Sequence, residues 1–264
     1  MAVFAALYVG AQVVAVAVLS GTSVPRLAVA VATLTGWGTY LVDRIGPTPG
    51  PPDRGDMRST PDRVRFLWRF DTPARVLAVL ALGGAFMLAL PWGGWASLVP
   101  LSVIGVLIYA RWAPPGRRIK DRLWLKTLAI AASITVFTLA LVHVAVDVPL
   151  RLLAIAGAVV FFRVMADAMR CDIEDAVSDA RVGTRTIANV FSPTTAWRCA
   201  LFLDCVAVGI AVTAVPMVGM PALAVGVIPC VASMVLMYTR PAAVRDWVDF
   251  LGATSVAVAW AVSV

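Results

Sequence analysis

Charged residues are scarce in this chain. Asp, Glu, Lys and Arg make up 14% of its 264 residues, whereas 61% of the residues are hydrophobic. The mean hydropathy is +0.88, and a soluble domain of this length would be much more polar. The composition therefore argues against a soluble globular protein. It predicts a single integral membrane domain over residues 1–264, with no separate soluble domain.

Residue types that carry catalysis in many soluble enzymes are also sparse. His143 is the only histidine and falls near the predicted outer end of a helix, so we do not expect a histidine general base. The four cysteines form no CxxC pair and show no zinc-ligand spacing. Cys171 and Cys199 fall on the predicted cytoplasmic side, where disulfides are rare. The scattered glycines form no phosphate-binding loop.

Long apolar segments are abundant. About nine of them are long enough to cross a hydrocarbon core of about 30 Å, which predicts an all-α, polytopic bundle of about nine transmembrane helices. We read the first segment as a retained helix rather than a signal peptide, because it lacks a basic leader and a convincing cleavage site. The predicted spans are 2–21, 24–43, 74–91, 94–111, 124–146, 149–168, 197–215, 218–238 and 246–264.

The positions of the basic residues predict the orientation. Nearly all Lys and Arg residues fall in the connections after the second, fourth, sixth and eighth segments. By the positive-inside rule, the loops near 44–73, 112–123 and 169–196 are cytoplasmic, as is the N-terminus. The net charge of +7 is then explained by topology, and we expect no nucleic-acid partner. The expected location is the plasma (inner) membrane.

Three carboxylates follow the sixth apolar segment at spacings of three and four residues: Asp172, Asp175 and Asp179. Such positions lie on one face of an α-helix, about 5–6 Å apart. At an effective dielectric of about 20, each pair of these charges repels by roughly 3 kcal/mol. The cluster therefore predicts a cation site, and aspartate oxygens favour Mg²⁺ or Ca²⁺ over zinc.

Acidic residues that fall within or at the ends of apolar segments are functional candidates, because a carboxylate in hydrocarbon is costly. Asp43 ends the second segment. For Asp167 we expect an ion pair with Arg163 on the same helix. For Asp204 a functional role and a pair with Arg198 both stay open.

The segment DIEDAVSDARVGTRTIA, in which DxxDxxxD is followed by Gly183 and Thr186, resembles the second aspartate-rich motif of the UbiA superfamily of intramembrane prenyltransferases. The number of apolar segments and the acidic motifs that end the second and sixth of them match the layout of that family. The sequence around Tyr109 and Lys126 is similar to the family's connection between the fourth and fifth helices. The resemblance covers nearly the whole chain.

The first aspartate-rich motif departs from the family pattern NDxxDxxxD. Thr39 and Tyr40 stand where Asn and Asp are usual, Asp43 matches the middle acid, and Pro47 replaces the last. The remaining acids nearby fall in a loop rich in Pro, Gly and Arg, where we interpret them as solvated: Asp53, Asp56 and Asp62.

The resemblance implies a Mg²⁺-dependent transfer of an isoprenoid chain from a prenyl diphosphate to an aromatic or lipidic acceptor, in contact with the lipid bilayer. It implies catalytic roles for four acids, which would also be the metal ligands, and for Lys126. The four acids are Asp43, Asp172, Asp175 and Asp179. The implied substrate-binding residues are Tyr40, Arg44, Tyr109 and Arg185.

Two alternatives stay open, because the first motif is degenerate. One is a membrane terpene cyclase, which ionises a prenyl diphosphate without an external acceptor. The other is a non-catalytic lipid-binding or transport protein on the same scaffold.

Overall fold

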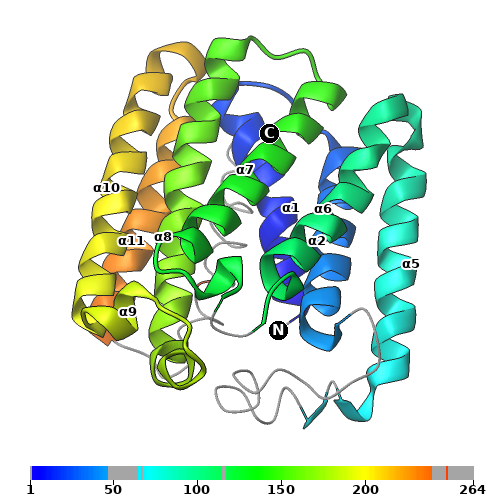
Figure 1. Cartoon of the computed structure of the whole chain (residues 1–264). Coiled ribbons are helices and arrows are strands. Elements are labelled where there is room, and N and C mark those ends of the chain that lie inside the picture. Colours follow the sequence, from blue (N-terminus) through cyan, green and yellow to red (C-terminus); the bar gives the residue numbers. More distant parts are fainter. Residues whose placement is uncertain (1, 47–64, 67, 115–116, 240–247, 249–264) are drawn as a thin grey trace.

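The computed structural model describes residues 2–46, 65–66, 68–114, 117–239 and 248, and the regular structure in these ranges is entirely helical (Figure 1). The prediction of an all-α fold is thus confirmed. The long helices are α1 (Ala2–Leu19), α2 (Arg26–Ile45), α5 (Asp71–Ala89), α6 (Leu98–Arg111), α7 (Leu125–Ala145), α8 (Leu150–Val182), α10 (Pro193–Val218) and α11 (Pro221–Thr239). The short ones are η1 (Leu90–Ser97), η2 (Ile119–Asp121) and α9 (Ile187–Val190).

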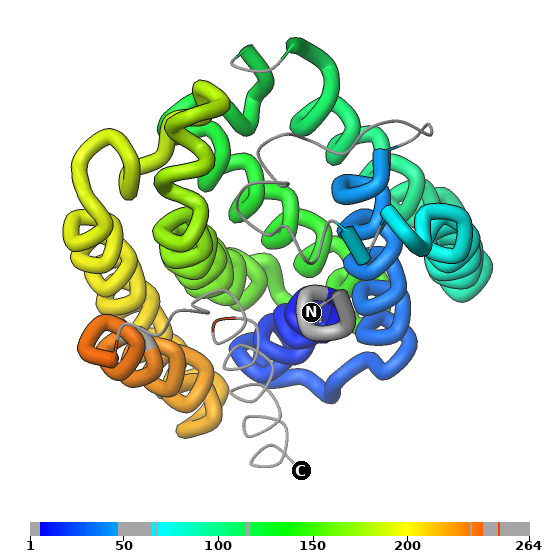
Figure 2. Tube along the Cα trace, turned by 90° about the horizontal axis from the view of Figure 1, so that it is seen from below, coloured from blue at the N-terminus to red at the C-terminus, as the bar shows by residue number. Residues whose placement is uncertain are grey.

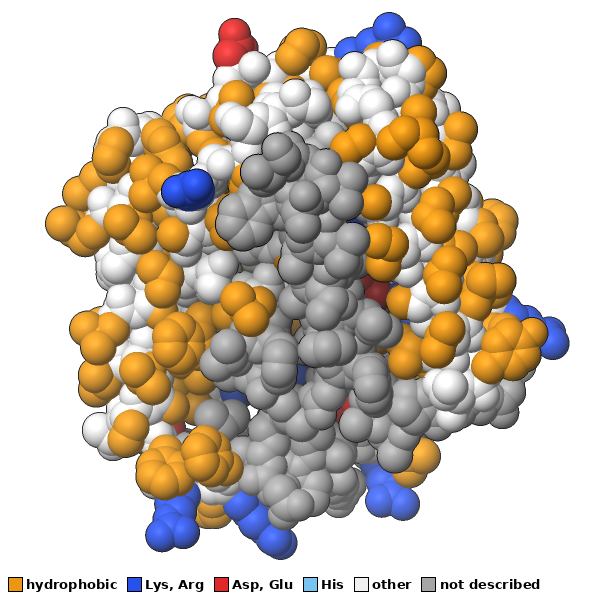
Figure 3. Space-filling view, turned by 180° about the vertical axis from the view of Figure 1, so that it is seen from behind, with side chains coloured by type: hydrophobic (Ala, Val, Ile, Leu, Met, Phe, Trp, Pro, Cys, Tyr) orange, Lys and Arg blue, Asp and Glu red, His pale blue; other side chains and the backbone are white. Residues whose placement is uncertain are grey.

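Five helical stretches in the described part are long and apolar enough to cross a membrane: Asp71–Arg111, Leu125–Ala145, Leu150–Val182, Pro193–Val218 and Pro221–Thr239. The apolar helix Ala6–Leu19 is shorter. In Figure 3, apolar side chains cover both flanks of the visible face and several basic side chains gather at its lower edge. Such a surface is stable in a bilayer, and the chain is an integral membrane protein. Eight of the nine predicted spans coincide with described helices, and the ninth, 246–264, lies almost wholly outside the described residues.

The prediction that the acidic motif ends the sixth helix is confirmed, because α8 continues past the predicted span 149–168 as one helix of 33 residues to Val182 and carries the motif on its last turns. The loop predicted near 169–196 is therefore helical up to Val182. Two predicted helix starts differ from the structure. The fourth span begins with the 3-10 segment η1, where Gly93 adopts φ 60 and interrupts the helix, so that α6 starts at Leu98. The seventh helix starts at Pro193 rather than 197, because Ser192 caps it by accepting a hydrogen bond from the Thr195 amide.

Small residues allow the helices to approach closely. The buried face of α5 is a row of alanines at helical spacing, Ala74, Ala78, Ala81, Ala85 and Ala89, and α5 packs against α2. A Cβ atom built on Gly38 of α2 would lie 2.4 Å from Leu82 Cγ of α5. Glycine and alanine at such contacts are typical of membrane helix packing, where close van der Waals contact stabilises the bundle.

The helices are arranged side by side around the long axis of the bundle (Figure 2). The N-terminus of α1 and the C-terminal ends of α2, α6 and α8 lie at one end of the bundle, where α7 begins and α9 lies (Figure 1). We call this the motif end. It brings together the ends of the two segments that carry the acidic motifs.

Candidate functional site

The acidic motif on α8 is held in register by the way this helix ends. Gly183 adopts φ 82, and the amides of Gly183 and Thr184 donate to the carbonyls of Ala180 and Asp179. This left-handed termination satisfies the last carbonyls of α8 and favours glycine. Thr186 then starts α9 with a capping box in which Asn189 is the partner. The Gly and Thr of the sequence motif thus stop one helix and start the next.

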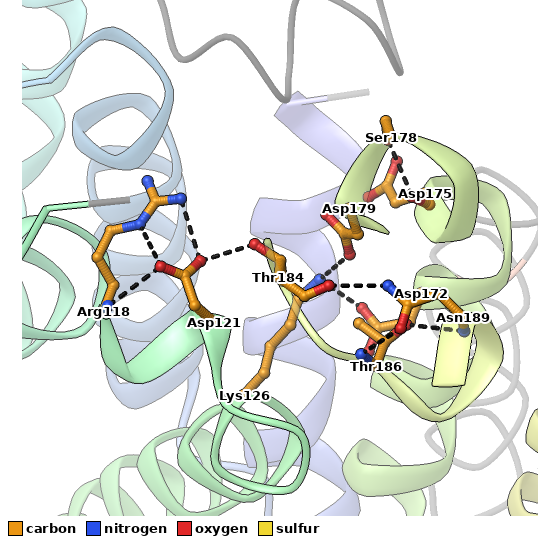
Figure 4. A network of polar contacts seen from close by, with 10 residues as sticks. All are labelled: Arg118, Asp121, Lys126, Asp172, Asp175, Ser178, Asp179, Thr184, Thr186 and Asn189. Atoms are coloured by element: carbon orange, nitrogen blue, oxygen red, sulfur yellow. Dashed lines mark hydrogen bonds and ion pairs between the residues drawn. The ribbon is translucent and has the colours of Figure 1, made fainter. Parts of the chain in front are cut away.

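Lys126 lies at the centre of the site (Figure 4). It belongs to the first turn of α7, and its Nζ lies 2.7 Å from Asp172 Oδ1 and 2.9 Å from Asp179 Oδ2. Side chains seven residues apart on α8 therefore converge on one ammonium group. The structure brings three of the predicted residues together and leaves little of any of them exposed, with 15% of the Lys126 side chain accessible and 8% and 14% of the two aspartates.

Asp175 occupies the same helical face but makes a different contact. Its backbone carbonyl accepts a hydrogen bond of 2.9 Å from Ser178 Oγ. In the described part of the chain, no group of three or more His, Cys, Asp or Glu side chains has the arrangement of a metal site. Lys126 stands between two of the acids, where the sequence suggests a cation.

The first motif lies at the end of α2. The Asp43 carbonyl accepts a hydrogen bond of 2.9 Å from Arg111 Nη2 at the end of α6. Asp43 Oδ2 is 3.9 Å from Arg44 Nε. Its Oδ1 is buried and accepts no hydrogen bond from the described residues. The Arg44 guanidinium lies over the Tyr40 ring, 5.4 Å from its centroid.

Thr39 does not replace the missing Asn of the first motif. Its Oγ1 donates to the Thr35 and Gly36 carbonyls at 2.7 and 3.2 Å. A hydroxyl bonded to its own helix in this way is not directed at a ligand. Asp43 is therefore the one acid that this helix end contributes within the described residues.

Tyr109 connects the two motifs. It lies at the end of α6, within electrostatic reach of Lys126, Asp43, Asp172 and Asp179. Acids that are more than 120 residues apart in sequence thus lie around one tyrosine. Arg185 lies nearby in the loop after α8, where its side chain is exposed.

Sequence reasoning missed a second polar cluster beside the site. Asp121 of η2 is 2% exposed. It accepts hydrogen bonds from Arg118 Nε and Nη2 at 2.9 and 3.1 Å and from Thr184 Oγ1 at 2.7 Å. Its carbonyl accepts a bond of 3.0 Å from the Arg185 amide. We call this cluster of Arg118, Asp121 and Thr184 the loop latch, because it ties the α6–α7 loop to the α8–α9 loop.

The latch has an electrostatic consequence. Burial by itself raises the pKa of Asp121, but the hydrogen bonds from Arg118 and Thr184 outweigh burial and lower the pKa below its ordinary value. Asp121 therefore stays ionised in the folded protein at neutral pH. The i, i+3 spacing of Arg118 and Asp121 was the available sequence signal, but nothing in the sequence pointed to Thr184.

The ion pair expected for Asp167 was wrong, and Asp204 takes another partner than the one that the sequence left open. Asp167 pairs with Arg170 rather than Arg163, and it also accepts a hydrogen bond of 2.7 Å from the Tyr8 hydroxyl. Asp204 pairs with Arg170 rather than Arg198. Arg170 thus connects α8 to α10 directly and to α1 through Asp167. Both aspartates are structurally paired at this position in the bundle.

Comparisons with known proteins agree with this architecture. No family model and no curated protein matches the chain. Solved structures do match. The structure of a UbiA homolog from Archaeoglobus fulgidus bound to GPP and Mg²⁺ aligns over 99% of this chain and 98% of its own, with a TM-score of 0.63 and 13% identity.

Further structures of the Archaeoglobus fulgidus UbiA homolog give the same result. The form bound to DMAPP and Mg²⁺ aligns over 99% and 98% of the two chains, with a TM-score of 0.60 and 12% identity. The form bound to Cd²⁺ aligns over 98% and 97%, with a TM-score of 0.60 and 15% identity. Over nearly its whole length, the chain therefore has the fold of these UbiA homolog structures.

Proposed function

We propose that this chain is an intramembrane, Mg²⁺-dependent prenyltransferase, which transfers an isoprenoid chain from a prenyl diphosphate to an aromatic or lipidic acceptor. The observation that carries the proposal is Lys126 held between Asp172 and Asp179 in one polar site, with Tyr109 and Asp43 within electrostatic reach, at one end of an apolar bundle. The shared fold supports it, since the homolog was solved with GPP and with DMAPP, each with Mg²⁺.

The donor set suits magnesium. Carboxylate oxygens are the hard ligands that Mg²⁺ prefers, and Asp43 Oδ1 is a buried acceptor that receives no hydrogen bond from the described residues. Asp43 from one motif, with Asp172, Asp175 and Asp179 from the other, would hold the ion once Lys126 turns toward the substrate. Bound Mg²⁺ supplies positive charge that stabilises the departing diphosphate.

The basic residues are placed to bind the diphosphate directly. An ammonium group has three N–H donors on a flexible stem, so Lys126 can exchange one of its two aspartate partners for a phosphate oxygen. Arg44 lies beside Asp43 and Arg185 follows the acidic motif. We assign both to the phosphate groups, where charge-assisted hydrogen bonds are strong.

The chemical step breaks the bond between C1 of the prenyl chain and the diphosphate oxygen, and the electron pair leaves with the diphosphate. Charge develops on that oxygen, and Lys126 stabilises it. The allylic carbon becomes cationic next to the aromatic residues Tyr40 and Tyr109, whose ring faces attract positive charge. The acceptor then bonds to C1 and releases a proton.

A membrane terpene cyclase is the second candidate. It is favoured by the contribution of a single acid from α2, since the Thr39 hydroxyl bonds to its own helix. Such an enzyme would ionise the same diphosphate and close a ring without an external acceptor. A non-catalytic lipid-binding or transport protein would use Lys126 only to neutralise the acids of α8.

We also propose that the motif end faces the cytoplasm of a cell whose plasma (inner) membrane holds the chain as a single domain, because the basic residues cluster at that end. Labelling of single-cysteine variants in intact cells tests this orientation. A residue in the α6–α7 loop should be protected from an impermeant maleimide until the membrane is permeabilised.

The decisive experiment measures release of pyrophosphate from geranylgeranyl or farnesyl diphosphate by the protein in detergent, with Mg²⁺ or with EDTA. Aromatic acceptors and a lipid extract are added in one arm and omitted in the other. Asp175→Asn is the test variant. Glu174→Gln is the matched control, because it removes a charge from the adjacent position, which points about 100° away around the helix.

A transferase releases pyrophosphate only with Mg²⁺ and an acceptor, and Asp175→Asn lowers turnover at least about 100-fold while Glu174→Gln stays near wild type. A cyclic product formed without acceptor would establish the cyclase instead. Binding of the diphosphate without any release would establish the non-catalytic reading and refute the proposed transfer.

A further inference from the structure

A second set of buried polar side chains lies on the opposite face of α8 from the acidic motif. Arg163, Asp167 and Arg170 are spaced by four and three residues, so they share one face. Nine residues separate Arg163 from Asp172, which is about 900° of rotation, or two and a half turns. The face that carries Arg163 therefore points away from Lys126. Its contacts are to α1, α10 and α11.

Arg163 is a buried cation with unused donors. It is 1% exposed, and its Nη1 donates a long hydrogen bond of 3.4 Å to the Val225 carbonyl of α11. Its Nε and Nη2 donate no hydrogen bond to the described residues. These two atoms form the edge of a guanidinium that binds two oxygen lone pairs side by side.

Two other arginines show what this edge does in the same protein. Arg118 Nε and Nη2 donate to the two oxygens of Asp121 at 2.9 and 3.1 Å. Arg75 Nε and Nη2 donate to the two oxygens of Asp71 at 2.8 and 3.0 Å. The edge of Arg163 is chemically identical but faces no such acceptor within the described chain, although this arginine is the most buried of the three.

Gln12 of α1 lies at the same depth in the bundle as Arg163 of α8. Helices α1 and α8 run antiparallel (Figure 1), and the hydrogen bond between Tyr8 and Asp167 sets their register. One turn further along α1 is Gln12, and one turn back along α8 is Arg163. Gln12 is 0% exposed, and neither its Oε1 nor its Nε2 has a hydrogen-bond partner in the described residues. We call these two residues the Gln12–Arg163 pair.

With the partners that the described residues offer, the Gln12–Arg163 pair is unfavourable unless it binds something. Buried amide and guanidinium groups without partners are strongly destabilising in an apolar core, and no bulk water reaches the middle of a bilayer. One turn of α8 is about 5.4 Å, so the pair lies about 20 Å from the start of the helix at Leu150. A ligand there must bring its own oxygen and must dissolve in lipid.

The net charge of the buried layer formed by Arg163, Asp167, Arg170 and Asp204 decides what kind of ligand oxygen fits. Arg163 and Arg170 contribute two positive charges, and Asp167 and Asp204 contribute two negative charges. The layer is thus already neutral, and an anionic ligand would leave a net negative charge in hydrocarbon. A neutral hydroxyl avoids this charge. Its lone pairs accept from the Arg163 edge, and its O–H donates to Gln12 Oε1.

We propose that the Gln12–Arg163 pair is a second binding site, between α1, α8 and α11, for the hydroxyl head of a neutral, lipid-soluble alcohol. The inference does not rest on the proposed function, because it concerns the other face of α8. It also needs neither Mg²⁺ nor a diphosphate.

The experiment uses a hexadecanol probe that carries a photoreactive diazirine beside the hydroxyl, added to the full chain in detergent. Labelled peptides are identified by mass spectrometry. Hexadecanol, palmitate and hexadecane compete as ligands with the same chain and a neutral, a charged or no head group. Arg163→Lys keeps the charge of the layer but removes the two-donor edge, and Gln12→Leu removes the acceptor. Lys120→Met, in the loop between α6 and α7, is the control for a change far from the pair.

We expect labelling on α1, α8 or α11 that hexadecanol displaces. Palmitate and hexadecane should displace the probe at least about tenfold less well, and Arg163→Lys or Gln12→Leu should weaken the labelling about tenfold. Lys120→Met should not change it. Labelling elsewhere, or unchanged labelling in both variants, would overturn the site. Equal competition by palmitate would overturn the neutral ligand class. No specific labelling would mean that a buried water alone satisfies the pair, which also refutes the proposal.

Discussion

Replacing Lys126 by methionine tests the central feature of the site, because one ammonium group bridges two carboxylates. Each N–O distance, 2.7 Å to Asp172 and 2.9 Å to Asp179, corresponds to an attraction of about 6 kcal/mol at an effective dielectric of about 20. Most of this offsets desolvation, and loss of one partner from a buried ion pair costs about 3–5 kcal/mol net. In a protein of this size, that lowers the melting temperature by about 6–20 °C.

Magnesium should reverse much of this loss. In the Lys126→Met variant the two acids face each other without a cation, so a divalent ion that binds between them stabilises the folded state. We expect the variant to gain more from Mg²⁺ than wild type does, because in wild type the ion competes with the ammonium group.

The assay is thermal unfolding in detergent, with EDTA or with millimolar Mg²⁺. Lys120→Met is the matched control, since Lys120 is the only other lysine in the sequence. If Lys126→Met melts at the wild-type temperature in EDTA, or gains no more than wild type from Mg²⁺, the two ion pairs do not hold the acids together and the reasoning fails.

Three further changes probe the surroundings of the site. Because the pKa of Asp121 is lowered in the folded protein, the latch contributes its full stabilisation above the ordinary carboxyl pKa of about 3.9 and loses it as the pH falls further. In Asp121→Asn, the free energy of unfolding measured between pH 6 and pH 3 should therefore fall less steeply with decreasing pH. A fall as steep as in wild type would contradict the latch. Asp43→Asn should raise the Mg²⁺ concentration needed for half-maximal pyrophosphate release at least about tenfold, since carboxylates bind this ion better than amides do. An unchanged Mg²⁺ titration would remove Asp43 from the metal site. Gly183→Ala places a side chain at φ 82, so it should destabilise the protein by about 1–2 kcal/mol in chemical unfolding, whereas Gly83→Ala, which meets no atom within 4 Å, should have little effect.

Much of the site was predictable because it depends on local periodicity. The spacing of Asp172, Asp175 and Asp179 determines a shared helical face wherever the helix is placed, and Gly183 ends the helix for reasons of backbone conformation. The apolar segments predict helices in the same way, since a chain in lipid must satisfy its own backbone hydrogen bonds.

The partners of the charged residues were not predictable from spacing. For Asp167, the same helix offers Arg163 four residues before and Arg170 three residues after, and local geometry allows both pairs. The choice of Arg170 depends on α10, which places Asp204 beside it, and on α1, which places Tyr8 beside Asp167. Likewise, nothing local relates Asp121 to Thr184, 63 residues away.

The amino-acid sequence by itself thus determined the apolar helices, the face of α8 that carries three acids, and the end of that helix, because each depends on residues within a few positions of one another. Only the tertiary structure decided that Lys126 lies between Asp172 and Asp179, that Asp121 latches two loops, and that Gln12 and Arg163 are buried in the bundle with polar atoms that have no partner among the described residues. Those contacts depend on the rotation and depth of each helix relative to its neighbours, which are set by packing across the whole bundle.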